Sequence, residues 1–245
     1  MSRTLSLNQP HIRAKVLGLT LVIIGLVLLF LNDLIDIKIS FAFILIGILM
    51  IFLITEKTVS SKISNAQING NFNAFENITK NLNLSGNAIF IPKSDILTEE
   101  RIFIPLDNKN SKIPNLHDDI VFSTGVDGKS LGMSIPPSGL KLLNEIEKES
   151  DLNFLNSEKI EDKLQSFVGI DLLRSIELKK SENIWKLELN KPIFCNGNKS
   201  MCKKYPCPTC SAILTAITRS TDKKIWINDV VHNGKKVDFS LKIGD

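Results

Sequence analysis

Two long runs without a charged residue dominate the first quarter of this 245-residue chain. Residues 16–31 read VLGLTLVIIGLVLLFL and residues 39–54 read ISFAFILIGILMIFLI. A helix that crosses a bilayer needs about 20 mostly apolar residues, and Lys15 can extend the first run because a lysine stem reaches toward the interface. We therefore predict a two-helix transmembrane hairpin within residues 1–55, with spans at about 14–32 and 38–55.

Basic residues beside these runs predict the orientation of the hairpin. Arg3, Arg13 and Lys15 precede the first run, Lys38 alone lies between the two, and two more lysines follow the second. Lysine and arginine close to a span favour the cytoplasmic side. We expect a cell-membrane protein with two spans, with both termini cytoplasmic and with the lipid bilayer as a partner. A cleaved signal peptide is disfavoured, since no small-residue cleavage site follows the first run.

Glycines within the two runs predict contact between the helices. Gly18 and Gly25 are seven residues apart and fall on one face of the first run, and Gly47 lies within the second. Small residues let helix backbones approach closely. A homo-oligomer that forms through the same hairpin is a further expectation.

The composition changes after residue 55, where a polar segment begins. We interpret residues 56–71 as a linker or helical extension and residues 72–245 as a cytoplasmic α+β domain. Phe72, Phe75, Ile78 and Leu82 form one apolar helical stripe at its start. Alternating apolar residues, turn signals and helical periodicity then predict strands at 88–92, 101–106, 119–123 and 131–136, helices at 138–150, 156–168 and 208–219, and antiparallel hairpins over 174–190 and 224–243.

Several of these segments resemble an uncharacterised family of archaeal membrane proteins with two N-terminal spans and a cytoplasmic domain. The likeness rests on the paired IFIP strands at 89–92 and 102–105, on GMSIPPSGLKLLNEIE, and on the order of the last strands and helix. It implies no known activity. Residues 170–245 also resemble small-molecule-binding domains of the vinyl reductase type, in which cysteines flank a helix between hairpins, although the final cysteine of such domains is missing here.

Charge and motifs exclude several classes of function. The net charge of +4 is small and the basic residues are interspersed with acidic ones, so we expect no nucleic-acid partner. STGVDGKS at 123–130 lacks the first glycine of a phosphate loop and is followed by LGMSIPP, which cannot begin the required helix. No catalytic constellation includes His11, His117 or His232. A non-enzymatic, membrane-tethered binding or sensory module is therefore the leading hypothesis, with an unknown small ligand or protein as its partner.

All four cysteines lie in one segment, CNGNKSMCKKYPCPTC at 195–210. Cys195, Cys202, Cys207 and Cys210 have the spacing C-x6-C-x4-C-x2-C, and four thiolates are sufficient for tetrahedral zinc or an iron–sulfur cluster. These four residues are the predicted metal ligands.

Two other interpretations of the cysteines stay open. Pro208 suits the first turn of a helix, which would place Cys207 and Cys210 at a positive helix end that lowers the pKa of a thiol. The alternative function is therefore a membrane-anchored thiol/disulfide or iron–sulfur redox protein that uses this pair. Cysteine also packs as a small apolar residue, and Cys210 shares a helical face with Ile213 and Ile217.

Overall fold

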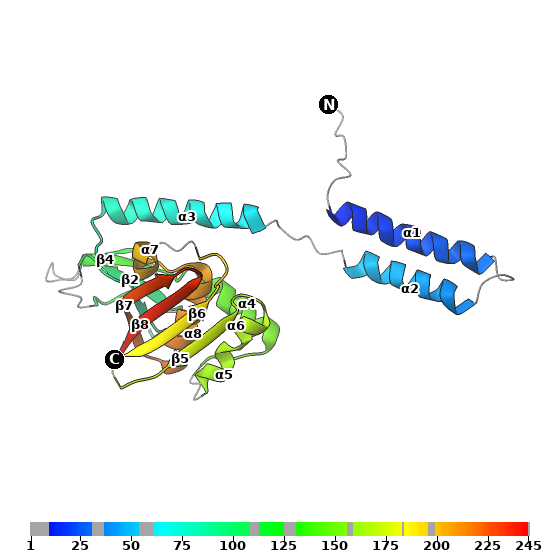
Figure 1. Cartoon of the computed structure of the whole chain (residues 1–245). Helices are drawn as coiled ribbons and strands as arrows, with labels where there is room; N and C mark the ends of the chain where they lie inside the picture. Colours follow the sequence, from blue (N-terminus) through cyan, green and yellow to red (C-terminus); the bar gives the residue numbers. More distant parts are fainter. Residues whose placement is uncertain are drawn as a thin grey trace, which may run out of the picture. The chain divides into compact units, whose positions relative to one another are not determined.

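A computed structural model describes residues 10–30, 37–53, 61–107, 113–124, 131–155, 159–182, 184–195 and 199–244 (Figure 1). The chain divides into two compact units, Met1–Ser61 and Lys62–Asp245. The first unit is a helical hairpin, and the second is an α+β domain.

The first unit consists of α1 (Pro10–Phe30) and α2 (Ile37–Leu53), which lie side by side. Their glycines allow this contact. A Cβ atom added at Gly25 would lie 2.6 Å from Cγ1 of Ile44, and one added at Gly47 would lie 2.7 Å from the carbonyl oxygen of Gly18. Real Cβ atoms do not approach other atoms so closely, so the glycines are required where the backbones meet. The predicted contact between the two helices is confirmed.

The transmembrane prediction is wrong for the helices that the structure describes. In α1 the charge-free part starts at Val16 and rises only about 22 Å to Phe30, while the 17 residues of α2 rise about 26 Å. A bilayer core is about 30 Å thick. Over the described ranges, no helix combines the length and the apolar character that crossing a membrane requires. The expected two-span cell-membrane localisation with cytoplasmic termini is corrected accordingly. Residues 31–36 and 54–60, at the predicted ends of the spans, lie outside the described residues.

The second unit is built on one eight-stranded sheet in which every neighbouring pair is antiparallel. The strand order is β3-β4-β2-β1-β7-β8-β6-β5. The strands are β1 (Ile89–Ile91), β2 (Arg101–Pro105), β3 (Phe122–Thr124), β4 (Leu131–Ile135), β5 (Ser175–Lys179), β6 (Trp185–Asn190), β7 (Lys224–Asn233) and β8 (Lys236–Gly244). The pairing of β1 with β7 joins the two halves of the domain.

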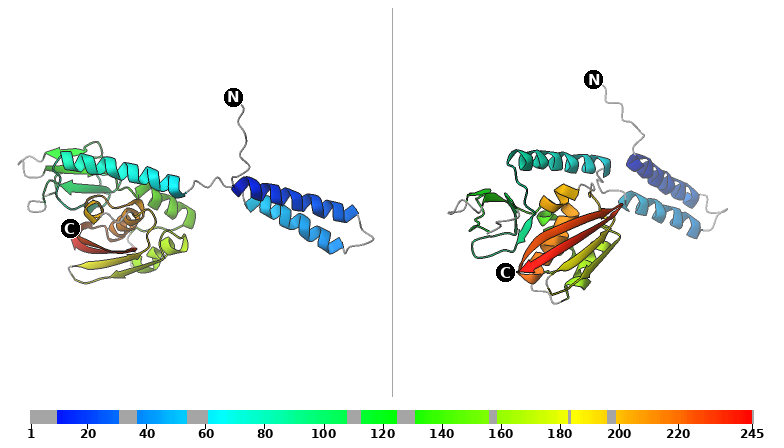
Figure 2. Two further views of the ribbon diagram at one scale, coloured as in Figure 1. Left: turned by 45° about the horizontal axis from the view of Figure 1, so that its top comes forward. Right: turned by 60° about the vertical axis from the view of Figure 1, so that its left-hand side comes forward.

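Helices cover one face of this sheet (Figure 2). They are α3 (Ser61–Asn81), α4 (Leu140–Ser150), α5 (Ile160–Leu164), α6 (Ser166–Gly169), α7 (Lys199–Lys204) and α8 (Pro208–Thr221). The central helix is α8, which contacts β1 and β7 as well as α4 and α5 and is buried along most of its length. The main core lies around α8, and a smaller apolar cluster covers the opposite face of β1 and β2.

The structure supports the α+β part of the predicted fold, with its antiparallel hairpins. Of two further segments, the first takes one of its two expected forms and the second differs from the expectation. The polar segment after residue 60 is helical, since α3 begins at Ser61, and Phe75 of this helix stacks on Tyr205 with ring centroids 4.1 Å apart. The single helix expected at 156–168 is divided into α5 and α6. Residues 156–158, and residues 125–130 of STGVDGKS, lie outside the described part.

Candidate metal centre

The cysteine segment crosses three structural elements. Cys195 lies in the loop that follows β6, Cys202 lies in α7, and Cys207 caps α8, whose first turn contains Cys210. Cys195 is partly exposed and the other three are buried. None of these four cysteines is in a disulfide.

The first turn of α8 has the geometry that the sequence predicts. Pro208 occupies the start of the helix, and the sulfur of Cys207 accepts a hydrogen bond from the backbone N–H of Cys210 at 3.5 Å. Gly139, which precedes α4, packs directly on this turn: a Cβ atom there would lie 2.1 Å from the backbone nitrogen of Ala212. The α4–α8 contact therefore determines where Cys207 and Cys210 lie.

Two sets of potential metal ligands converge here, and Cys195 belongs to both. One set is Cys195, Cys207 and Cys210; the other is Cys195, Cys202 and His232. Within each set the ligand atoms lie within 4.8 Å of one another. The structure thus brings three of the four predicted cysteines together and places Cys202 with Cys195 and a histidine.

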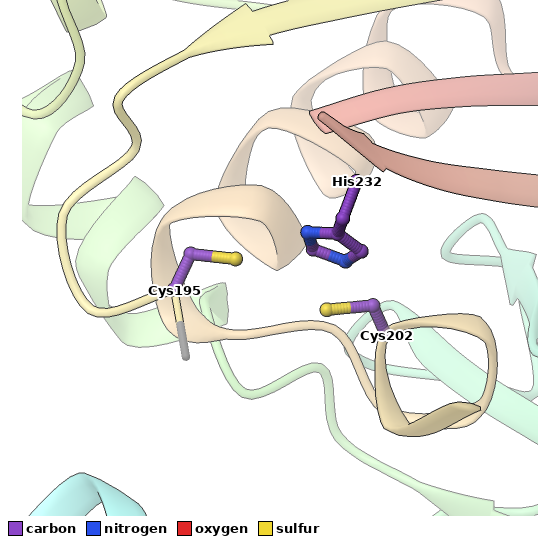
Figure 3. Close-up of side chains that lie close together, drawn as sticks. All are labelled: Cys195, Cys202 and His232. Carbon is purple, nitrogen blue, oxygen red and sulfur yellow. The ribbon is translucent and has the colours of Figure 1, made fainter. Parts of the chain in front are cut away.

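His232 is the ligand candidate that the sequence analysis missed. It lies near the end of β7, and Figure 3 shows the thiols of Cys195 and Cys202 pointing toward its ring. Its Nε2 atom is buried and has no hydrogen-bond partner. The only signal in the sequence was the position of His232 in the hairpin that follows the cysteine helix. The sequence does not show which distant strands pair, so it could not predict that His232 lies beside the cysteines.

The pKa values of the buried thiols are raised, contrary to the expectation from the helix end. A hydrogen bond with the Cys195 thiol and then burial raise the pKa of Cys202. The same neighbour raises the pKa of Cys207, as it does for Cys210, where burial adds to the effect. In the metal-free protein these thiols are therefore protonated at neutral pH, which disfavours a reactive thiolate.

The loop before Cys195 has an unusual backbone. Lys191 and Phe194 have φ angles of 52° and 64°, in the left-handed region that bulky residues seldom adopt. Three hydrogen bonds hold the loop. Its Ile193 N–H donates to Leu172 O at 2.9 Å, its Lys191 N–H donates to Lys235 O at 2.7 Å, and the hydroxyl of Thr209 donates to Ile193 O at 2.7 Å. Strained residues held this firmly are typical of functional sites.

Two acidic residues away from the cysteine cluster have structural partners. Asp118 accepts hydrogen bonds from the N–H and the hydroxyl of Thr98, at 3.0 and 2.7 Å. Glu100 forms a two-bond ion pair with Arg219 at 2.6 and 2.9 Å. Both carboxylates therefore act as local anchors in the described structure.

Comparison with known proteins identifies a family for most of the chain. A family model described as a domain of unknown function, DUF7982, matches residues 11–167. No curated protein and no solved structure matches the chain. The match confirms the expected likeness to an uncharacterised family but gives no information on an archaeal source, on two spans or on a vinyl reductase likeness. It ends before Cys195, so the cysteine cluster lies outside the matched residues. The chain belongs to the DUF7982 family.

Proposed function

We propose that this protein is a metal-dependent binding module whose cysteine cluster, Cys195, Cys202, Cys207 and Cys210, holds a thiophilic ion such as zinc or an iron–sulfur cluster. The observation that carries the proposal is the position of Cys195, whose thiol is close to two other donors in each of two sets. Thiolate and imidazole are the donors that zinc takes in tetrahedral protein sites.

Burial distinguishes this proposal from the redox alternative. Cys207 and Cys210 have no exposed surface, and their raised pKa values leave little thiolate at neutral pH. A dithiol that exchanges with partner proteins needs an accessible thiolate. A metal ion, in contrast, displaces thiol protons and can bind in a buried site.

The architecture supports a binding role for the domain. Its ligand candidates come from a loop, two helices and a strand that are distant in the sequence, so an ion would link α7, α8 and the β7–β8 hairpin. Small-molecule binding by residues 170–245, which the resemblance to vinyl reductase type domains implies, is part of the proposal.

The test is a zinc titration of the full chain, purified without oxygen, in competition with a chromophoric chelator. Cys195→Ser should weaken zinc binding by more than the roughly 10- to 100-fold that loss of an outer-shell partner costs. Thermal unfolding of the same variant shows whether it remains folded. Unchanged zinc affinity in folded Cys195→Ser would contradict the proposal, and a reversible Cys207–Cys210 disulfide in a metal-free protein would favour the redox alternative.

A further inference from the structure

His232 has a buried polar atom that the protein leaves without a partner. This atom is Nε2, and a ring nitrogen of His232 lies within 4.8 Å of the sulfur atoms of Cys195 and Cys202 (Figure 3). Buried polar side-chain atoms nearly always have a hydrogen-bond partner, and an exception points to a bound ion or water. The neighbouring soft donors favour an ion, because thiolate and imidazole together suit zinc.

A cavity of about 580 Å³ reaches two of these three donors, Cys195 and His232. Cys195 and His232 form part of its wall, with Asn65 and Asn69 of α3 on another side. Pockets that hold small molecules have volumes of about 300–1,000 Å³. The cavity is therefore large enough for a small ligand that touches an ion bound at these residues.

The charged residues that line the cavity indicate which kind of ligand it can bind. Lys191 and Lys235 line it, and of the described residues no aspartate or glutamate does so. Neither lysine forms an ion pair with another described residue. Two ammonium groups beside a metal cation favour an anion.

The wall of the cavity is also organised in advance. Lys191 and Phe194, the two residues with left-handed φ angles in the loop, both line it. The backbone hydrogen bond from Lys191 to Lys235 joins this loop to the β7–β8 turn, so both lysines are held on one rim. A rigid wall lowers the entropic cost of binding a ligand.

We propose that Cys195, Cys202 and His232 hold one metal ion, whose fourth coordination position opens into this cavity and binds a small organic anion that also reaches Lys191 and Lys235. Three protein ligands with one open position are typical of zinc sites that bind an exchangeable ligand, whereas structural sites are closed by four. This inference rests on the proposed metal binding and specifies which set of donors the ion uses.

Cys207 and Cys210 then have a supporting role. Both are fully buried, and their sulfur atoms lie within 4.8 Å of the Cys195 sulfur. Outer partners of this kind orient a ligand and tune its basicity. Their replacement should weaken the metal site without removing it.

The first experiment determines which donors the ion needs. The full chain is loaded with cobalt(II) in place of zinc, and its visible spectrum and cobalt affinity are compared among variants. His232→Gln should lose the tetrahedral spectrum and bind cobalt at least about 100-fold more weakly, while His117→Gln, an exposed matched control, should not change either. Cys207→Ser should keep the spectrum, with affinity reduced about 10- to 100-fold.

The second experiment tests the open position with azide as the anion. Azide added to the cobalt-loaded chain should change the visible spectrum in a saturable way, because it enters the coordination shell. The double variant Lys191→Met/Lys235→Met should bind azide about two- to thirtyfold more weakly, as expected for two exposed charges. Lys141→Met/Lys148→Met on α4 removes the same charge away from the cavity and should leave azide binding unchanged.

The outcomes separate this inference from the metal proposal. Cobalt binding that needs Cys207 and Cys210 but not His232 would overturn the inference and leave the metal proposal intact, and so would a spectrum that azide does not change. A full chain that binds no metal at all would overturn both.

Discussion

Gly139→Ala is the substitution for which the structure gives the sharpest expectation. The added Cβ atom would lie 2.1 Å from the nitrogen of Ala212 and 2.3 Å from the oxygen of Pro208, both backbone atoms of α8. Ordinary contact begins at 3.4 Å, so α4 and α8 must separate by about 1.3 Å. The φ of Gly139 is −97°, which alanine adopts without strain, so the cost is steric.

The expected loss of stability is large because the contacting backbone atoms cannot easily move away from the added Cβ atom. Overpacking a core costs about 1–3 kcal/mol and occasionally more. Because neither backbone atom can rotate away, we expect about 3 kcal/mol for Gly139→Ala. In a domain of this size, 1 kcal/mol corresponds to about 2–4 °C in Tm. The first turn of α8 carries Cys207 and Cys210, so zinc affinity should fall as well, by the roughly 10- to 100-fold typical of a disturbed outer partner.

Urea unfolding of the metal-free full chain measures the change in the free energy of unfolding, and competition with a chelator measures the change in zinc affinity. Gly70→Ala is the matched control, since a Cβ atom at Gly70, within α3, meets nothing within 4 Å. This control should stabilise the protein by up to about 1 kcal/mol, because glycine is a poor helix former. A Gly139→Ala protein that unfolds within about 0.5 kcal/mol of the parent would refute the steric reasoning.

Three further predictions concern charges and protons. Arg219→Met leaves the Glu100 carboxylate, whose side chain is 6% exposed, without its two-bond partner, and should cost about 3–5 kcal/mol in urea unfolding. Zinc affinity should rise with pH between about 6 and 8. The pKa of Cys202 is raised, so its thiol is protonated in the metal-free protein and the ion must displace that proton. Competition titrations at several pH values measure this dependence. The hydroxyl of Thr98 is the first cause of the lowered pKa of Asp118, so Thr98→Val should raise that pKa toward its ordinary value in an NMR titration.

Local patterns in the sequence predicted most of the elements. The last hairpin is an example: Val237, Phe239 and Leu241 are buried and alternate with more exposed residues along β8, and Gly234 takes the positive φ of 63° that the turn requires. A period of two identifies a strand with one buried face, and Asn-Gly identifies the turn. Such signals need no knowledge of the rest of the fold.

What the sequence did not reveal depends on residues far apart along the chain. Pairing of β1 with β7 brings Ile89 opposite Trp226, and no local sequence pattern predicts that these two residues are neighbours. His232 meets Cys195 and Cys202 only after β7 has taken its place in the sheet. The membrane error had a different cause: the prediction rested on counting apolar residues, whereas no helix over the described ranges is both long and apolar enough to cross a membrane.

The central claim is that the cysteine cluster holds a metal ion, and metal content tests it most directly. The full chain is purified without oxygen, and its zinc and iron are measured by elemental analysis beside those of Cys195→Ser. The account predicts a near-stoichiometric metal in the parent and its loss in the variant, because Cys195 belongs to both donor sets. A folded parent chain that contains no metal and takes up none would contradict it.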